Sequence, residues 1–316
     1  MWTPPSDSEL SALRALRGEG DWQLDGRVVH LTNLDKQMLP GRDGEAPLTK
    51  RDLIEYYARV APWIGPYLWG RPVNLHRFPN GTEQPGFWNK AVPSHAPEWI
   101  RRWPSPFSSG AERDYFVLDG AVSLAWVANY GAFELHPWTS TAAVPDVPSF
   151  ALIDIDPGPD TTWDETLVLA RLFRTAIEHL GLIARPKVTG QRGVQIWIPV
   201  DGVGSFDDTR RLVVALSRTV GATVPTMGSW KWHKADRHGK ARLDYTQNAL
   251  NKTLVAPFSI RPAPGGPVSI PIEWDELDDD ELRPDRWTAR SVWERVSAHG
   301  DPFLAMIGVR QRLPEL

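Results

Sequence analysis

Apolar residues recur at helical spacing in several segments of the chain. In the segment 50–60 they lie three or four positions apart, and Thr49 with Asp52 forms a capping box directly in front of them. A second capping box, Ser6 with Glu9, begins a shorter segment near the N-terminus. The pattern therefore predicts a helix at both places. Two more segments are predicted to be helices, 163–180 and 208–219.

Shorter apolar runs predict strands, mostly in the second half of the chain. These runs are 150–155, 188–199 with a glycine turn at its centre, 242–245 and 253–261. Strands and helices alternate irregularly, with hairpin-like pairs, which indicates an α+β fold rather than a doubly wound parallel sheet. The proline- and glycine-rich span 79–110 predicts loops around short strands, and 139–149 predicts a connection between two lobes.

Two carboxylates stand at the end of an otherwise apolar strand. Asp154 and Asp156 are separated by one residue, so both side chains point from the same face of that strand. Burying unpaired carboxylates is costly, and a divalent cation such as Mg²⁺ or Mn²⁺ would compensate them through oxygen ligands. A pair that only caps the following turn is the alternative, because two aspartates at this spacing often occur by chance.

A third carboxylate and a glycine-containing turn favour the metal site. Asp244 lies on another predicted strand, and three aspartates on adjacent strands are typical of two-metal phosphoryl or nucleotidyl transfer. The turn 189–193 joins two strands, and its glycines would let backbone N–H groups approach an anion while Arg192 adds a charged fork. For the turn alone, a simple hairpin is the better explanation.

The composition limits the chemistry that is available. Of 316 residues, 41% are hydrophobic and 23% are charged, which excludes a disordered chain, a coiled coil or a collagen. There is no cysteine, so disulfides, thiolate catalysis and zinc fingers are excluded, and any metal must bind Asp, Glu or His. No apolar run predicts a transmembrane helix and no secretory signal is found, so we expect no membrane partner and a cytoplasmic location.

The charge is unevenly distributed along the chain. A net charge of −4 argues against nucleic acid as a partner, but the segment 273–286 carries eight acidic residues against two arginines, and the remainder has a charge of +2. The remainder contains a basic stretch that is opposed only by Asp236: Lys231, His233, Lys234, Arg237, His238, Lys240 and Arg242. Such a stretch is more often a solvated surface than a phosphate site. The 16 tryptophans leave room for one or two base-stacking platforms.

Nine ordered motifs resemble the polymerase domain of bacterial ATP-dependent DNA ligase D, which belongs to the archaeo-eukaryotic primase superfamily. They are LDKQMLP, TKRDLIEYY, RFPNG, PGFWNK, ELHPW, DIDPG, TGQRGVQIWIP, LDYTQN and KTLVAPFSIR. The resemblance implies a primase-polymerase fold, with mixed or antiparallel sheets flanked by helices and two lobes around a central cleft. The implied divisions are an N-terminal extension 1–30 and a single catalytic domain 31–316, with lobes 31–140 and 150–275 and an acidic segment with helices at 276–316. No ligase or nuclease domain accompanies the motifs, so we expect a stand-alone form.

The resemblance also implies the residues of an active site. Asp154, Asp156 and Asp244 match the family's catalytic aspartates, which bind two Mn²⁺ or Mg²⁺ ions. The residues that match nucleotide-binding positions are His136, Thr189, Arg192, Gln195, Arg237, Gln247, Ser259 and Arg261. Two of them depart from the family. Gln195 stands where the family has a histidine and cannot carry a charge, and Arg192 replaces a lysine but keeps the charge.

Two further groups of residues would contact the nucleic acid. Those that match positions stacking on template and nucleotide bases are Phe87, Trp88 and Arg77. Those that match a pocket for the 5′-phosphate beyond a gap are Asn33, Lys36 and Lys50. The position of Lys50 independently favours phosphate binding, because a helix N-terminus with a lysine attracts anions. Sequence spacing alone does not bring Lys36 and Lys50 together.

The implied activity is metal-dependent and template-dependent nucleotidyl transfer by a gap-filling polymerase that accepts or prefers ribonucleotides, in the repair of DNA double-strand breaks. The implied partners are gapped or broken DNA with a 5′-phosphate, NTP or dNTP, Ku and a separate DNA ligase. We expect a monomer in the bacterial cytoplasm, associated with the nucleoid. Two alternatives remain open: a catalytically weak module that binds DNA ends, which Gln195 favours, and a metal-dependent nuclease that uses the same aspartates.

Overall fold

The computed structural model describes residues 2–107, 114–231 and 233–314, and the side chain of Lys234 in the basic stretch lies outside this description. The helices are α1 (Asp7–Ala15), α2 (Lys50–Arg59), α3 (Ala61–Leu68), α4 (Ala121–Asn129), α5 (Trp163–His179), α6 (Phe206–Thr223) and α7 (Val292–His299), with 3-10 helices η1 (Lys234–Arg237), η2 (Trp274–Asp278) and η3 (Pro302–Met306). The strands are β1 (Gly20–Leu24), β2 (Arg27–Leu31), β3 (Gln37–Leu39), β4 (Leu48–Thr49), β5 (Val73–Arg77), β6 (Phe87–Asn89), β7 (Arg102–Pro104), β8 (Asp114–Phe116), β9 (Ala132–Pro137), β10 (Phe150–Asp156), β11 (Arg185–Val188), β12 (Val194–Pro199), β13 (Gly228–Ser229), β14 (Ala241–Asp244) and β15 (Ile270–Pro271).

The chain folds into two compact units whose boundaries differ from the predicted lobes. Unit 1 consists of 1–138, 255–268 and 288–292, and unit 2 consists of 139–254, 269–287 and 293–316.

The N-terminal residues and the segment 255–268 both belong to unit 1, and hydrogen bonds connect each of them to the rest of that unit. The Arg51 guanidinium on α2 donates to the carbonyl oxygens of Leu13 and Leu16 at the end of α1. In the later segment, the Ala256 N–H donates to the carbonyl oxygen of Leu135 on β9 at 2.9 Å. Residues 1–30 thus lie in unit 1 together with the first predicted lobe, and the predicted lobe 150–275 is divided between the two units.

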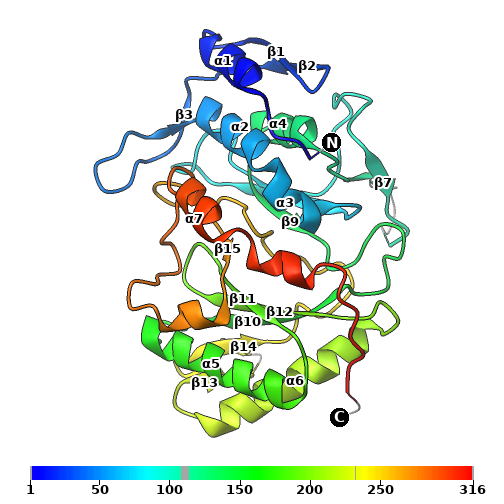
Figure 1. Ribbon diagram of the computed structural model, residues 1–316, viewed down its shortest axis with the longest axis vertical. Helices are drawn as coiled ribbons and strands as arrows, with labels where there is room; N and C mark the ends of the chain where they lie inside the picture. The colour runs from blue at the N-terminus through cyan, green and yellow to red at the C-terminus, as the bar shows by residue number, and fades with distance from the viewer. Residues whose placement is uncertain (1, 108–113, 232, 315–316) are drawn as a thin grey trace. The chain divides into compact units, whose positions relative to one another are not determined.

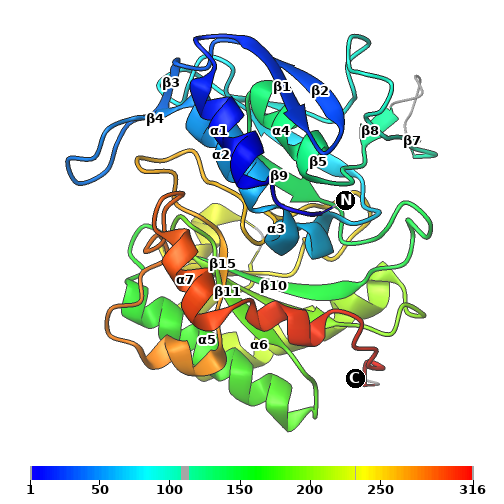
Figure 2. The same cartoon turned by 45° about the horizontal axis from the view of Figure 1, so that its top comes forward.

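Unit 1 is built around strand β5. This strand pairs antiparallel with β6, β8 and β9, so that His76 faces Trp88 on one neighbour and Glu134 on the other. Helices α2 and α4 pack against each other in the same unit, with α2 capped by Thr49 and Asp52 as predicted (Figures 1 and 2). Helix α4 was not predicted, because its sequence is apolar on all sides and has no helical period.

Unit 2 contains a six-stranded sheet in the order β13-β14-β10-β12-β11-β15, in which only the pair β13–β14 is parallel. Helices α5 and α6 pack together and against β10 (Figures 1 and 2). Leu243 on β14 lies beside Gly221 of α6, and its register partner Ile155 shares that face. Because side chains alternate along a strand, Asp154 and Asp244 point from the opposite face. The mixture of helices and largely antiparallel sheets confirms the predicted α+β class.

Most elements predicted in the second half of the chain form, and one of these predictions is wrong. The segments 150–155, 163–180, 188–199, 208–219 and 242–245 correspond to β10, α5, the hairpin β11–β12, α6 and β14. The segment 253–261 is not a strand and has only isolated bridging residues such as Ile260. The cause is a turn at Pro257 and Phe258, where Phe258 adopts a φ of +63° that a strand does not allow.

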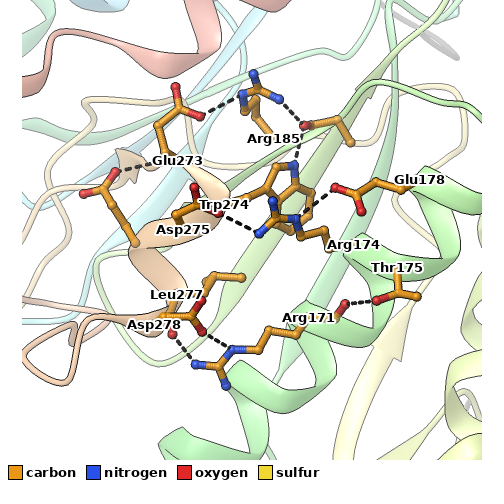
Figure 3. Close-up of polar contacts among 12 residues, drawn as sticks. Arg171, Arg174, Thr175, Glu178, Arg185, Glu273, Trp274, Asp275, Leu277 and Asp278 are labelled. Atoms are coloured by element: carbon orange, nitrogen blue, oxygen red, sulfur yellow. Dashed lines mark hydrogen bonds and ion pairs between the residues drawn. The ribbon is translucent and has the colours of Figure 1, made fainter.

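The acidic segment 273–286 is part of unit 2 and is neutralised there. Arg171 and Arg174 on α5 contact Asp278 at 2.7 Å and Asp275 at 2.9 Å (Figure 3). Arg185 on β11 contacts Glu273 at 3.1 Å in the same region. These ion pairs attach η2 to its neighbours, which explains why so much negative charge is tolerated in one segment. No helix in the described ranges combines the length and the apolar character that crossing a membrane would require.

Candidate active site

The three predicted metal-binding aspartates lie on adjacent strands of unit 2. Asp154 on β10 is directly opposite Asp244 on β14, and Asp156 follows two positions later on the same face. The register continues across the sheet, since Asp154 faces Gln195 on β12 and Gln195 faces Lys187 on β11. We call this transverse line of four side chains, Asp244, Asp154, Gln195 and Lys187, the aspartate row.

The electrostatics of the aspartate row are unfavourable to its own negative charge. Burial raises the pKa of Asp154 to about 6, and the nearby charges of Asp244 and Asp156 act in the same direction. A hydrogen bond from Gln195 and the charge of Lys187 oppose this increase without cancelling it. Asp154 therefore lacks sufficient positive charge in its surroundings, which is the condition that a bound cation relieves.

The present partners of the aspartates are polar side chains and an arginine. Asp244 Oδ1 accepts hydrogen bonds from the Thr246 N–H at 2.8 Å and hydroxyl at 2.7 Å, and Arg242 Nη2 lies 3.1 Å away. Asp156 is half exposed and lies 3.6 Å from Arg192. Within the described ranges no three Asp, Glu or His side chains already surround one point as a finished metal site would. Donor type and shared face fit a hard divalent cation, and the side chains must turn toward one another to hold it.

The predicted phosphate turn 189–193 packs closely against strand β10. A Cβ atom at Gly193 would lie 2.3 Å from the carbonyl oxygen of Ile155, so only glycine allows this approach. The Thr189 hydroxyl accepts hydrogen bonds from the N–H groups of Gly193 and Gln191, and the Gly190 N–H donates to Pro284. Since these turn amides already have partners inside the protein, Arg192 is the better candidate in this turn for binding an anion.

A pocket of about 350 Å³ opens beside the aspartates. Asp156, Arg192, Arg237 and Lys240 line it, so three cationic side chains face one carboxylate. The buried Nε of Arg237 has no hydrogen-bond partner among the residues that the structure describes. Gln247, another predicted nucleotide-binding residue, lies 3.4 Å from Asp244 Oδ2 through its Nε2. The pocket and the aspartates together could accommodate a metal-bound polyphosphate.

The two members of the aspartate row that are not carboxylates, Gln195 and Lys187, are also buried. Gln195 is 4% exposed and bonds to Asp154, so its side chain acts on a metal-binding candidate. Lys187 is completely buried, and its Nζ donates to Ser269 Oγ at 2.6 Å. Sequence analysis missed Lys187. Its position seven residues before Val194 gives no hint of the strand pairing that aligns it with the aspartates.

In unit 1, the predicted nucleotide-binding residues His136 and Arg261 meet at Glu134, which sequence analysis missed. Arg261 Nε lies 2.6 Å from Glu134 Oε1, and His136 Nε2 lies 4.0 Å from Glu134 Oε2. His76 Nδ1 donates a hydrogen bond to the same Oε2. Burial raises the pKa of Glu134, but the hydrogen bond from His76 and the charge of Arg261 outweigh it, so this pKa is lowered. The carboxylate of Glu134 is therefore already compensated within the protein.

The predicted base-stacking residues lie on and beside strand β6. Trp88 is 52% exposed and stacks on His76 with a centroid distance of 4.5 Å and an interplanar angle of 9°. Phe87 is also exposed, and the Arg77 guanidinium lies 5.0 Å from its ring and 3.2 Å from the ring of Tyr130. Arg77 itself is buried and donates to the Tyr130 carbonyl at 2.8 Å. Arg77 thus packs against the Phe87 ring, and its own buried guanidinium is not exposed for stacking on a base.

Ser259, another predicted nucleotide-binding residue, lies inside unit 1. Ser259 is completely buried, its hydroxyl accepts a hydrogen bond from the Leu135 N–H at 2.9 Å, and it lies 3.2 Å from the Tyr57 hydroxyl. These contacts connect the segment 255–268 to β9 inside unit 1. The Ser259 hydroxyl therefore has a structural role in this unit, and its contact with a nucleotide stays a prediction.

The structure brings together Asn33, Lys36 and Lys50, the predicted 5′-phosphate residues. The Lys50 N–H donates to the Lys36 carbonyl at 2.8 Å, and the Lys36 N–H donates to the Asn33 carbonyl at 3.1 Å. Burial, together with the nearby charge of Lys36, lowers the pKa of Lys50 to about 8. The Lys36 ammonium donates to the Pro79 carbonyl at 2.8 Å and to Asn80 Oδ1 at 3.0 Å. The Lys50 ammonium donates to the Thr32 hydroxyl at 3.3 Å, so both cations bond to neutral oxygens that an anion would have to replace. The antiparallel pairing of β3 with β4, which places Gln37 opposite Thr49, creates this proximity, which sequence spacing did not reveal.

The chain is similar to several known proteins. The sequence model of a family described as "LigD, primase-polymerase domain" matches residues 49–303. The multifunctional non-homologous end joining DNA repair protein LigD of Mycobacterium tuberculosis (strain H37Rv) is 31% identical over 281 residues, and the match covers 86% of this chain and 36% of that protein. The bifunctional non-homologous end joining protein LigD of Bacillus subtilis is 28% identical over 277 residues, with 87% of this chain and 43% of that protein covered. The chain thus spans less than half the length of these relatives.

A solved structure is also similar. The polymerase domain from Mycobacterium tuberculosis ligase D, in complex with DNA, superimposes with a TM-score of 0.80 and 29% sequence identity. The match covers 90% of this chain and 99% of the solved one. The similarity therefore extends over nearly all of both chains.

Proposed function

Because the chain belongs to the family of LigD primase-polymerase domains, nucleotidyltransferases of non-homologous end joining, we propose that it extends a primer 3′-hydroxyl against a template and fills short gaps at DNA breaks. The observation that carries this proposal is the aspartate row, with Asp156 beside it and a cationic pocket adjoining it. Acidic side chains that lack compensation, next to arginines that could bind phosphate, are what metal-dependent nucleotidyl transfer requires.

Polymerase domains of this family are metal-dependent in general. We propose that Asp154, Asp156 and Asp244 hold Mn²⁺ or Mg²⁺ in this chain. When bound, two such cations lower the pKa of the attacking 3′-hydroxyl and stabilise the pyrophosphate leaving group. Gln195 and Lys187 orient and partly neutralise Asp154 from within the sheet. Arg242 would have to release Asp244 for the carboxylate to turn toward a cation.

The side chains around the pocket are proposed to bind the triphosphate. Arg192 and Arg237 would neutralise phosphate oxygens and keep the chain of phosphates aligned for displacement. Thr189 can donate its hydroxyl proton while accepting the turn amides, and Gln247 lies against Asp244. In unit 1, His136 and Arg261 are proposed to contact the incoming nucleotide.

The proposed nucleic-acid substrate is gapped or broken DNA whose downstream strand carries a 5′-phosphate. Lys36 and Lys50 would bind that phosphate, with Asn33 as a hydrogen-bond partner, and Phe87 and Trp88 would stack on bases. We further propose that the chain acts as a monomer with Ku and a separate ligase, and that it accepts ribonucleotides.

One observation favours a second candidate function, a module that binds DNA ends without efficient synthesis. The ammonium groups of Lys36 and Lys50 bond to neutral oxygens, whereas Asp244 is already paired with the cationic Arg242. A protein that kept only the first site would still hold broken ends.

A gapped-duplex extension assay separates these functions. The substrate carries one unpaired template base and a downstream 5′-phosphate, and each NTP and dNTP is supplied in turn with Mn²⁺. We expect addition of the nucleotide complementary to the template base. Tight binding to the 5′-phosphate gap without any addition would favour the end-binding module, and shortening of the primer would favour a nuclease.

A further inference from the structure

Trp88, His76 and Glu134 form a second transverse row, in unit 1. The register of β6, β5 and β9 places these three residues directly opposite one another. We call them the glutamate row. His76 and Glu134 have no role in the function proposed above, yet each is in contact with residues that do.

Glu134 distributes its two oxygens between different partners. Oε1 contacts Arg261 at 2.6 Å, whereas Oε2 accepts the hydrogen bond from His76 Nδ1 and lies 4.0 Å from His136 Nε2. The carboxylate is 4% exposed, so water cannot readily replace any of these partners. Any rotation of the carboxylate therefore affects the arginine and both histidines together.

His76 transmits the position of Glu134 to the surface. One face of the His76 ring stacks on Trp88 in a nearly parallel arrangement, and the hydrogen bond to Glu134 fixes the rotation of that ring. His136 contacts the same Trp88 edge-on, with centroids 4.7 Å apart and an angle of 87°. An exposed tryptophan is thus held in one orientation by two histidines that both approach a single buried carboxylate.

We propose that Glu134 is a positioning residue that couples two parts of nucleotide recognition: through Arg261 it orients the group that binds phosphate, and through His76 it orients the tryptophan that stacks on the base. The inference rests on the proposed function, since it takes a nucleotide as the ligand. His76 is the second positioning residue of this coupling. Loss of the His76 ring should weaken only the stacking of Trp88 on the base, whereas loss of the Glu134 charge should weaken both base stacking and phosphate binding.

The two branches can be measured separately with two ligands in Mn²⁺ buffer without primer. ATP contains a base and three phosphates, whereas inorganic triphosphate contains only the phosphates. We expect His76→Ala to weaken ATP binding about tenfold, as loss of a stacking contact does, and to leave inorganic triphosphate binding unchanged. Glu134→Gln should weaken the binding of both ligands. His76→Phe keeps a ring beneath Trp88 and should recover part of the ATP affinity.

A second readout does not depend on nucleotide binding. With ¹⁵N-labelled tryptophan, the indole N–H resonance of Trp88 is identified by its absence in Trp88→Phe. We expect this resonance to shift or broaden in both Glu134→Gln and His76→Ala. The matched control is Glu55→Gln, which removes another glutamate of unit 1 that pairs with arginines, Arg14 and Arg59, and should change neither binding nor the spectrum.

The outcomes distinguish this inference from the proposed function. If His76→Ala weakens both ligands equally, or if the Trp88 resonance is unchanged in Glu134→Gln, the coupling is wrong. If the wild-type protein binds neither ligand, the nucleotide role fails, and an unchanged Trp88 resonance in the same variants would overturn the positioning role as well.

Discussion

The aspartate row of unit 2 and the glutamate row of unit 1 both align side chains directly opposite one another on neighbouring strands, but the negative charge is balanced differently in the two rows. In the aspartate row, burial and two neighbouring acids raise the pKa of Asp154 to about 6. In the glutamate row, a histidine and an arginine outweigh burial and lower the pKa of Glu134. An acid that already has its cations serves as a support, whereas an acid that lacks them is prepared for a cation from outside.

The largest expected effect separates the two rows by activity. Asp154→Ala or Asp156→Ala should abolish primer extension while the fold remains intact, because the packing of β10 depends on Phe150, Leu152 and their neighbours. The gapped-duplex assay measures extension, and a thermal melt checks the fold. Asp278→Ala removes an exposed aspartate of the same unit as a control. Extension by either variant at close to the wild-type rate would contradict the role of the aspartates.

The next prediction sharpens the comparison through stability. Glu134→Gln should destabilise the metal-free protein by about 3–5 kcal/mol at pH 8, because it breaks a buried ion pair, and the loss should shrink as the pH falls below about 4. Asp154→Asn should instead stabilise it at pH 8, by up to about 3 kcal/mol, since the raised pKa means that ionisation is disfavoured in the folded state. This gain should disappear below about pH 4, where Asp154 is protonated folded and unfolded. Denaturant unfolding at pH 8 and below about pH 4 measures both changes in the free energy of unfolding. Destabilisation by both substitutions at pH 8, or stabilisation by both, would contradict the difference between the two rows.

The 5′-phosphate site provides a third prediction. At pH 7, binding to a gap with a 5′-phosphate should be stronger by about 2–4 kcal/mol than to a 5′-hydroxyl gap, and added salt should reduce the difference. Between pH 7 and 9 the preference should fall, because Lys50 has a pKa of about 8 and loses its charge, whereas the phosphate is already fully ionised. Lys50→Ala should have little preference at any pH. Competition binding with matched substrates measures this, and a preference independent of pH would exclude Lys50.

Arg192→Ala should weaken nucleotide binding about 10- to 100-fold and DNA binding much less, because a charge-assisted contact to phosphate contributes about 1.5–3 kcal/mol. Arg211→Ala, on the surface of α6, is a suitable control. Titrations with ATP and with gapped DNA give the two affinities. Equal losses in both affinities would indicate that Arg192 contacts DNA rather than the nucleotide.

The smallest expected effect concerns Gln195. Gln195→His restores a group that can be charged beside Asp154, and it should tighten nucleotide binding by about 2- to 5-fold, the range of one modest polar contact. Steady-state extension at varied nucleotide concentration would show this as a lower KM. An unchanged KM would mean that this chain relies on Arg192 and Arg237 instead.

Patterns along a single segment were predictable from the sequence, and pairing between segments was not. The spacing of Asp154 and Asp156 and the capping box of Thr49 and Asp52 are local, and the structure confirms the elements they predict. Glu134 occupies the same alternating position relative to His136, but its importance comes from His76, 58 residues earlier on a paired strand.

The wrong predictions have equally physical causes. The segment 253–261 has the composition of a strand, yet Pro257 cannot donate to a sheet and Phe258 turns with a positive φ. Helix α4 was missed because a helix buried on all sides has no polar stripe.

The central claim is that the aspartates of unit 2 bind a cation and that the glutamate of unit 1 does not. Titration of Mn²⁺ into the metal-free protein, followed by the loss of the free-ion electron paramagnetic resonance signal, tests it without any need for catalysis. We predict that wild type and Glu134→Gln bind Mn²⁺ alike, and that binding is lost in Asp154→Asn and in Asp244→Asn. Mn²⁺ binding of equal affinity and stoichiometry in all four proteins would contradict the account.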